Sequence, residues 1–322
     1  MPDVFSHSED LAENVLFNPI RDGANRLCIL SSHATPSMAS WLLKSYEEQD
    51  ISNVSVELIV GAVIDEGIDE ASHNSFREIH ENKSAGEWGH FTCSYIRQPP
   101  SNRQNYYIWL DGEKPMHAFM GSYNFTQASM LRRGSGTMRP YAAGAAYSRY
   151  EKAVDRSIYC NHAEVEDYIV VKPSIIDAAP QIPDRIKEYC VRLSLLARGG
   201  NTGTKSGLNW GQRNKRNKNE AYIPLPVTIA RSGFFPLNKE HFLVVTDDHH
   251  TLQLRVEQEN DKAITTPASN AQLGEYFRNR LGLANGEYVT KEHLLNYGRT
   301  DVTFYKIDEE QYYMDFSIET SR

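Results

Sequence analysis

The segment NYYIWLDGEKPMHAFMGSYN, residues 105–124, contains two largely apolar runs separated by turn-forming residues. The runs at 105–111 and 117–124 are rich in aromatic residues, which favour strands, and the intervening GEKPM supplies glycine and proline for a turn. The segment therefore predicts a β-hairpin that ends in the polar sequence Gly121-Ser122-Tyr123-Asn124.

Around this hairpin, residues 26–172 alternate between short apolar runs and segments with helical periodicity. In residues 36–48, Pro36 takes the first helical position, and Met38, Leu42 and Tyr46 fall on one side of the helix. Strands separated by helices predict an α/β domain with a mostly parallel, helix-covered sheet and an added hairpin. The other predicted strands are residues 26–32, 54–63, 91–97 and 139–148, and the other predicted helices lie near residues 68–83, 149–170 and 183–197.

The character of the chain changes after residues 197–207, ARGGNTGTKSG, which have the composition of a linker. One helix is predicted beyond it, at 268–283, with Ser269 or Asn270 as its cap. Many short strands with one helix indicate a small barrel or pseudobarrel. We expect an α/β domain over 1–172, a helical connector and linker over 173–204, and a mainly-β pseudobarrel over 205–322. The predicted strands of this last part are residues 221–230, 241–248, 251–258, 301–308 and 311–318.

The composition is ordinary for a globular protein, since 40% of the 322 residues are hydrophobic and 24% are charged. The formal net charge of −8 argues against general affinity for nucleic acid. A local basic patch can still contact phosphate, because the net charge is only an average over the surface.

The cysteines, the amino-terminal residues and the apolar runs exclude several classes of protein. The cysteines are widely spaced and form no C-x-x-C pair, so they predict neither a zinc site nor a disulfide framework. The first residues lack a basic stretch followed by an apolar run, and no apolar run is long enough to cross a membrane. We expect a cytoplasmic protein with reduced thiols that needs no metal and no cofactor and has no membrane contact.

A basic segment stands out in this acidic chain. Residues 198–218 contain six lysines and arginines and no acidic residue. Arginine, asparagine and glutamine read the edges of base pairs, while lysine neutralises phosphate. The segment therefore indicates a nucleic-acid interface, and a solvated, flexible basic loop is the alternative. The candidate DNA-binding residues here are Asn209, Trp210, Gln212, Arg213 and Arg216.

A second polar set follows in the same half of the chain. Asp247 and Asp248 could accept hydrogen bonds from the cytosine amino group, although a β-turn also explains this pair. We interpret the following His249 and His250 as turn or surface residues. The candidate DNA-binding residues of this set are Asp247, Asp248, Arg278, Arg280 and Arg299, and Gln258, Asn260, Lys262 and Tyr297 accompany them.

Long stretches of this half resemble the C-terminal domain of NgoFVII-type restriction endonucleases. They include SGLNWGQR at 206–213, TDDHHTLQLRVEQEN at 246–260 and YGRTDVTFYKIDEEQYYMDFS at 297–317, and the resemblance covers essentially all of 205–318. It implies a pseudobarrel similar to the DNA-binding domain of plant transcription factors, which grips the major groove between two arms. The expected partner is therefore a specific sequence of double-stranded DNA.

Residues 106–130 resemble the signature of phospholipase-D-type nucleases of the same family, chiefly through Gly121-Ser122-Tyr123-Asn124. The resemblance implies a His-x-Lys pair on the first strand of the hairpin. Such a histidine attacks phosphorus, while the lysine and the Ser and Asn side chains hold the phosphoryl oxygens. The reaction needs no metal, and a dimer assembles the complete site.

The sequence departs from this pattern at the two essential positions. Arg103 occupies the position of the histidine and Asn105 that of the lysine. A guanidinium stays protonated and cannot attack phosphorus, and an amide carries no charge. Residues 131–140 also lack the expected acidic residue, although Ser122 and Asn124 remain. Arg103, Arg132 and Arg133 could still form a phosphate-binding cleft.

Three interpretations follow. In the first, the domain has lost hydrolysis and retains DNA binding or dimerisation. In the second, another histidine, His117 or His33, serves as the nucleophile. In the third, this alignment of the signature is wrong. For each histidine, the simpler alternative is a half-buried, hydrogen-bonded structural residue.

The candidate catalytic residues are Ser122, Asn124, Arg103, Asn105 and His117, and they leave open whether the chain is an enzyme. The expected function is a restriction endonuclease or its catalytically degenerate DNA-binding descendant. The alternatives are a regulatory DNA-binding subunit and a phospholipase-D-like phosphodiesterase acting on another substrate. A homodimer through the first domain and a separate ATPase subunit are the further partners that the resemblance implies.

Overall fold

The computed structural model describes residues 11–83, 90–132, 136–174 and 184–318, and the chain divides into two compact units, Met1–Ala178 and Ala179–Arg322. Each unit contains its own hydrophobic core. Among the described residues, no helix has the length and apolar character needed to cross a membrane.

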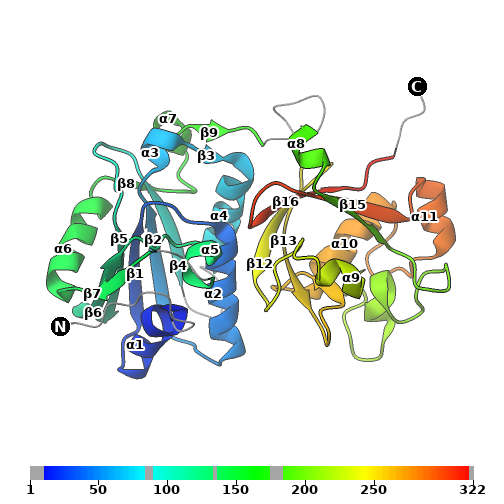
Figure 1. Cartoon of the computed structure of the whole chain (residues 1–322), viewed down its shortest axis with the longest axis horizontal. Helices are drawn as coiled ribbons and strands as arrows, with labels where there is room; N and C mark the ends of the chain where they lie inside the picture. Colours follow the sequence, from blue (N-terminus) through cyan, green and yellow to red (C-terminus); the bar gives the residue numbers. More distant parts are fainter. Residues whose placement is uncertain (1–10, 84–89, 133–135, 175–183, 319–322) are drawn as a thin grey trace. The chain divides into compact units, whose positions relative to one another are not determined.

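A seven-stranded sheet forms the centre of the first unit (Figure 1). Strands β1, β2 and β4 are parallel to one another, whereas β5, β6, β7 and β8 each run antiparallel to a neighbour. The predicted α/β class is confirmed, but the prediction of a mostly parallel sheet is wrong. Parallel neighbours need a long crossover connection, and here helices connect only β1 to β2 and β2 to β4. In spatial order the strands are β7 (Met138–Pro140), β6 (Lys114–Gly121), β5 (Asn105–Asp111), β1 (Arg26–Ser31), β2 (Ser55–Val60), β4 (Phe91–Ile96) and β8 (Ser157–Tyr159).

Helices cover both faces of this sheet. On one face, α2 (Pro36–Glu48) and α4 (Glu70–Lys83) close the larger core, and on the other α6 (Ala143–Val154) lies over β1, β5 and β6 (Figure 1). Central strand β5 is buried from both sides, and its Trp109 donates a hydrogen bond of 2.7 Å to Val15 O. The remaining elements are short: a π-helical turn at Glu13–Phe17, α1 (Asn18–Arg21), α3 (Val63–Glu66), α5 (Gln127–Met130), α7 (Val165–Tyr168), and β3 (Ile68–Asp69) paired with β9 (Val171–Lys172).

The strand predicted at residues 139–148 is wrong for most of its length. Only β7 is extended, and α6 begins at Ala143. Alanine has the highest intrinsic helix propensity, and the segment contains four alanines between 142 and 146. Ala146, Tyr150 and Ala153 are buried at helical spacing, so the apolar pattern belongs to a helix that packs on the sheet.

The second unit confirms the predicted mainly-β pseudobarrel. Its seven-stranded sheet curves until the two edge strands β10 and β11 contact each other without pairing, which leaves the barrel nearly closed. In spatial order the strands are β10 (Cys190–Ser194), β15 (Asp301–Lys306), β16 (Gln311–Asp315), β12 (His241–Thr246), β13 (Thr251–Glu257), β14 (Ala263–Thr265) and β11 (Ile223–Pro224).

Helix α10 (Asn270–Arg280) confirms the helix predicted at 268–283. Ser269 caps its first turn, and Leu273, Tyr276 and Phe277 are buried. The sequence analysis missed α11 (Lys291–Tyr297), where Thr290 and the side chain of His293 form a reciprocal cap. The other helical turns are α8 (Asp184–Lys187), a 3₁₀ segment at Gly207–Gln212, and α9 (Val227–Ala230).

Two predictions near the start of this unit are wrong. The helix predicted near 183–197 ends at Lys187, and β10 follows, because Leu193 and Leu195 alternate inward with exposed Ser194, which is the period of a strand. The strand predicted at 221–230 is reduced to the two residues of β11, followed by α9. Proline at 224 and 226 lacks the N–H group that a longer ladder needs.

We predict opposite effects for two glycine-to-alanine substitutions in helices. In α10, a Cβ at Gly274 would lie 1.6 Å from Asn219 O, so Gly274→Ala should lower the free energy of unfolding by about 1–3 kcal/mol through overpacking. In α6, nothing lies within 4 Å of a Cβ at Gly144, so Gly144→Ala should stabilise by up to about 1 kcal/mol. Urea denaturation of both variants measures the difference, and equal stabilisation would contradict the packing of α10.

Candidate functional site

The basic segment of the second unit is a folded loop. Gly211 N donates a hydrogen bond of 2.7 Å to Glu220 O, which closes the loop. A Cβ at Gly211 would lie 2.1 Å from Asn217 O, so only glycine permits this approach. Hydrogen bonds hold the loop in a defined conformation while its cations are exposed, so the segment is not an irregular flexible loop. The exposed cations of residues 198–218 are Arg198, Lys205, Arg213, Lys215, Arg216 and Lys218.

Trp210 and its neighbours hold one end of this loop in place. The Arg216 guanidinium lies 4.2 Å from the centre of the Trp210 ring and also pairs with Glu220. Tyr222 packs edge-on against the same indole, with ring centres 5.6 Å apart. Gln212 donates to Gly286 O at 3.0 Å, and Arg213 Nε donates to Lys205 O at 2.9 Å. Arg213 is the predicted contact residue of this loop that is exposed and has no acidic partner among the described contacts.

A groove of about 990 Å³ is lined in part by residues from the start of the basic segment, between Arg198 and Gly207. Its cations are Arg198, Arg231 and Lys262, and Asp261 is its acidic residue. Hydroxyl groups, the amide of Asn260 and several apolar side chains also line the groove. Such polar groups can contact phosphate and base edges. The further polar residues that line it are Ser194, Ser206, Tyr222, Thr228 and Asn260.

The turn between β13 and β14 forms one rim of the groove. Gln258, Asn260 and Asp261 all have positive φ, at 71°, 63° and 53°, and Asp261 N donates to Gln258 O at 3.0 Å. Asparagine and aspartate tolerate this left-handed backbone better than other side chains. The turn thereby presents Asn260 and Lys262 to the groove, although neither is among the ten candidate DNA-binding residues of the sequence analysis.

Two predicted DNA-binding residues lie in the interior of the barrel. Arg278 is fully buried, and it donates to the carbonyl oxygens of Glu287 at 2.8 Å and Leu208 at 3.2 Å. Burial lowers its pKa from the ordinary value. Asn209 is equally buried and both donates to and accepts from the Val289 backbone. These side chains fix the loops around α10 and do not reach the surface.

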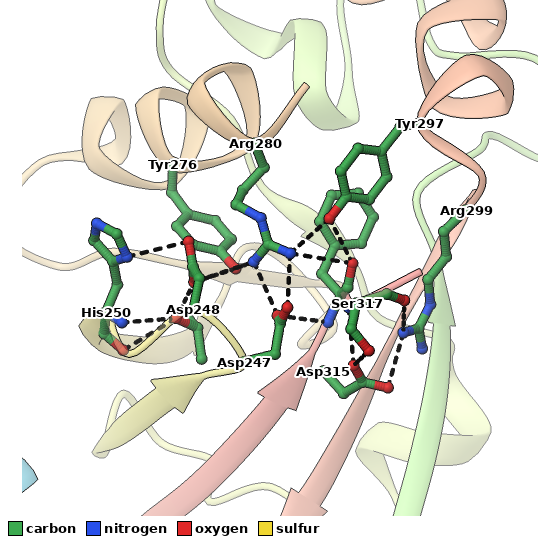
Figure 2. A network of polar contacts seen from close by, with 11 residues as sticks. Asp247, Asp248, His250, Tyr276, Arg280, Tyr297, Arg299, Asp315 and Ser317 are labelled. Carbon is green, nitrogen blue, oxygen red and sulfur yellow. Dashed lines mark hydrogen bonds and ion pairs between the residues drawn. The ribbon is translucent and has the colours of Figure 1, made fainter. Parts of the chain in front are cut away.

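Arg280 stands at the centre of a second internal network (Figure 2). Its guanidinium donates to both oxygens of Asp247, at 2.7 and 2.9 Å, and lies 3.1 Å from Asp248 Oδ1. Tyr297 OH lies 2.6 Å from the same guanidinium, and Asp247 also accepts from Phe316 N at 2.9 Å. Asp247 and Asp248 form the turn between β12 and β13, so the network joins that turn to α10 and to the end of β16.

Arg299 forms a neighbouring ion pair with Asp315 at 2.8 Å, and only 13% of its side chain is exposed (Figure 2). Desolvation raises the pKa of Asp315, but Ser317 and Arg299 together bring it below the ordinary value. Desolvation likewise opposes ionisation of Asp248, and Thr246 and Arg280 more than offset it, so that its pKa is lowered. Arg278, Arg280 and Arg299 are thus engaged in internal contacts. The exposed loop and the groove remain as the candidate interface of the second unit.

In the first unit, Asn105, which the sequence analysis aligns with the lysine, forms a structural cross-link. Its Oδ1 accepts from Ser31 Oγ at 3.0 Å and from Ser32 N at 2.9 Å, and its Nδ2 donates to Gly121 O at 3.2 Å. The side chain is almost fully buried. It joins the ends of β1, β5 and β6, so that both amide atoms already have partners.

The Gly-Ser-x-Asn turn lies against the end of β1. Ser122 is exposed and accepts from Thr137 N at 2.9 Å, and half-buried Asn124 precedes Phe125, whose N–H donates to His33 O at 3.1 Å. Arg103, two residues before β5, forms ion pairs with Asp65 and Glu66.

His33 also joins this edge of the sheet, since its Nε2 lies 2.9 Å from Glu66 Oε2. His117 pairs with Trp109, four residues before Gly121 on β6, and lies 3.1 Å from Asp22 Oδ2. Four residues of strand span about 13 Å, so the structure brings His33, and not His117, to Arg103. Arg133 lies outside the described residues. Within the described part of the chain, no group of three or more histidine, cysteine or acidic side chains is placed to hold a metal ion.

Comparison with known proteins assigns both units. Residues 9–167 match the family model described as the NgoFVII restriction endonuclease N-terminal PLD domain, and residues 184–308 match its C-terminal B3-like DNA-binding domain. No curated protein matches the chain.

Among solved structures, NucT from Helicobacter pylori and the phospholipase D family member Nuc from Salmonella typhimurium are each 14% identical. Each match covers 49% of this chain and 98% of the other, with TM-scores of 0.34 and 0.33. Polyphosphate kinase from Porphyromonas gingivalis is also 14% identical over 56% of this chain and 26% of its own, with a TM-score of 0.29.

We predict that two arginines of the second unit differ sharply in their contribution to stability. Arg280→Ala leaves Asp247 buried without its cation, and should lower the free energy of unfolding by about 3–5 kcal/mol. Arg213→Ala removes an exposed side chain and should change it by less than about 0.5 kcal/mol. Urea denaturation followed by tryptophan fluorescence checks both values. A loss below 1 kcal/mol for Arg280→Ala would contradict the internal role, on the scale of typical single substitutions.

Proposed function

Because the chain belongs to the NgoFVII restriction endonuclease family, we propose that it recognises a specific sequence of duplex DNA through the groove and basic loop of its second unit. The observation that carries this proposal is the group of exposed cations in the basic loop, together with a groove whose lining includes three cations and the amide of Asn260. Exposed cations contact the phosphate backbone, and the polar side chains of the groove contact base edges.

The side chains divide into two roles within this proposal. Lys205, Arg213 and Lys218 are exposed and contact phosphates, which fixes the position of the protein on the duplex. Asn260 and Lys262 lie in the groove and read base edges, since an asparagine amide matches adenine and a lysine matches guanine. Asp261 beside them accepts from cytosine or repels a misplaced phosphate.

We further propose that the first unit does not hydrolyse DNA by the phosphohistidine route of phospholipase-D-type nucleases. Asn105 already uses both amide atoms in internal hydrogen bonds, and Arg103 pairs with two carboxylates. Neither residue can replace the nucleophile and the lysine. The chain then acts as a DNA-binding component of a restriction system, and a homodimer through the first unit and a separate ATPase subunit are the proposed partners.

The first prediction from this proposal concerns duplex binding. Selection from a randomised duplex pool should yield one preferred sequence, and binding to it should weaken steeply with salt because cations on the protein release counterions. Alanine at Lys205, Arg213 or Lys218 should each reduce the slope of log K against log salt by about one. Alanine at Asn260 or Lys262 should relax the selected sequence at a cost of about 1–3 kcal/mol.

Arg21→Ala is the matched control for these variants, since Arg21 is an exposed arginine of the first unit. It should leave both the salt slope and the selected sequence unchanged. Binding that is insensitive to salt, or a pool that remains random after selection, contradicts the proposed interface.

The second prediction concerns cleavage. The selected duplex should remain intact with this chain alone in EDTA, because no nucleophile occupies the position of Arg103. Denaturing gels of end-labelled duplex, with and without Mg²⁺ and ATP, measure this. EDTA-resistant cutting that disappears in His33→Ala but persists in His117→Ala would instead show that His33 has replaced the lost nucleophile.

A further inference from the structure

Two of the four cysteines, far apart in the sequence, lie opposite each other in the first sheet. Strands β4 and β8 are antiparallel, and Ser94 pairs with Tyr159. The same register, continued by one residue, places Cys93 opposite Cys160, and Cys160 N donates to Cys93 O at 3.0 Å. Side chains directly opposite each other in an antiparallel pair point to the same face of the sheet. Both thiols accordingly belong to the larger core, which α2 and α4 close.

The imidazole of His80, on α4, contacts both cysteines. In an antiparallel pair, a residue whose O accepts from its partner also offers its N–H to that partner. Here Cys93 N donates instead to His80 Nδ1, at 3.1 Å. Because a backbone N–H only donates, Nδ1 carries a lone pair in this contact. Cys160 Sγ lies 3.8 Å from the same atom, so that His80 is also a proton acceptor for this thiol.

The two thiols differ in how readily they ionise. Hydrogen bonding with the Cys93 thiol, and secondarily with His80, outweighs burial and lowers the pKa of the Cys160 thiol. Burial raises the pKa of the Cys93 thiol. Since the thiolate and not the thiol is the nucleophile, Cys160 is the member of the pair that attacks an electrophile first. Cys93 then lies beside it as the second thiol.

A disulfide between these two strands is compatible with the backbone. Hydrogen-bonded residues opposite each other in an antiparallel pair have Cα atoms about 5.5 Å apart. A disulfide needs a Cα separation of about 4.4–6.8 Å. The other two cysteines are placed differently: Cys28 belongs to the core on the opposite face of the sheet, and Cys190 belongs to the second unit. The geometry therefore selects Cys93 and Cys160 as the pair.

We propose that Cys93 and Cys160 are an oxidation site, at which a peroxide converts the two thiols into a reversible disulfide. Cys160 gives its proton to His80, and its sulfur attacks one oxygen of hydrogen peroxide. The O–O bond breaks, and the other oxygen takes the proton from His80 and leaves as water. The Cys93 sulfur then attacks the sulfenic acid on Cys160, the S–O bond breaks, and the departing hydroxide takes the Cys93 proton to form a second water. Two thiols are oxidised, and one peroxide is reduced to two waters.

Both thiols are buried, so the peroxide reaches them when this end of the sheet opens locally. Strand β8 has only three residues and lies at the edge of the sheet, where opening needs less free energy than global unfolding. The cross-link then ties β8 to β4 and restricts the unfolded chain between them, which should stabilise the first unit. The site lies in the first unit and shares no residue with the basic loop or the groove, so it is independent of the proposed DNA binding.

Oxidation of the folded, full-length chain tests the proposal. The variant Cys190→Ser is used, because the exposed thiol of Cys190 could link two chains. After treatment with hydrogen peroxide, alkylation in urea, digestion and mass spectrometry, peptides joined through Cys93 and Cys160 should appear, while Cys28 should be alkylated. Dithiothreitol should return both thiols. The oxidised chain should melt several degrees above the reduced chain, and dithiothreitol should remove this difference.

Cys28→Ala is the matched control, since it removes an equally buried cysteine of the same sheet and should leave the cross-link unchanged. His80→Gln keeps an acceptor for Cys93 N but not a base, and should slow cross-linking at least about tenfold. Two fully alkylated thiols after peroxide treatment overturn the proposal, and so does a cross-link that forms only when the oxidation is carried out in urea. An unchanged rate in His80→Gln contradicts the role of His80 as proton acceptor.

Discussion

The buried ion pair between Arg280 and Asp247 determines which charged side chains of the second unit are engaged internally and which remain exposed. It joins α10, the turn between β12 and β13, and the end of β16, and it does so with side chains that are 14% and 9% exposed. Removing two charges from water is costly, and the two-point geometry together with Tyr297 offsets that cost. Because Arg280 is engaged by Asp247 and Asp248, its charge is not free for an anionic partner, and the exposed cations of the basic loop remain.

This separation explains how a chain with a net charge of −8 can carry a DNA-binding surface. Part of the acidic content is paired internally: Asp247 and Asp248 with Arg280, and Asp315 with Arg299. The loop from 205 to 218, in contrast, has no acidic residue. The net charge counts internally paired and exposed side chains alike, whereas a DNA duplex contacts only the exposed side chains. The spatial distribution of charge, and not its sum, is therefore the relevant property.

The sequence was sufficient for elements whose periodicity was unambiguous, such as α2, the β5–β6 hairpin and α10 with its Ser269 cap. It failed where one apolar pattern suits two structures, as in α6 and β10, because packing decides between them. It also could not separate Arg213 from Arg278, since the residue type does not reveal whether an arginine is exposed or buried. Only the fold reveals that Arg278 donates to backbone carbonyls inside the barrel. The sequence does not show that the turn at Asn260 presents this side chain to the groove, because the left-handed backbone cannot be read from residue types.

The edge of the first sheet shows why the departure from the His-x-Lys pattern is not confined to two side chains. The Oδ1 atom of Asn105 satisfies Ser31 Oγ and Ser32 N, which a lysine cannot do, because its ammonium only donates. A lysine at 105 would therefore leave a buried backbone N–H without an acceptor, at a cost of about 1–3 kcal/mol. A histidine at 103 would face Asp65 and Glu66, whose charges repel a phosphodiester. The side chains that hydrolysis would require at positions 103 and 105 are thus incompatible with the present hydrogen bonds and ion pairs at these positions. If Arg103 and Asn105 occupy the two positions of the pattern, the surrounding residues use them as part of the fold, and changing this pair alone would not produce the pattern.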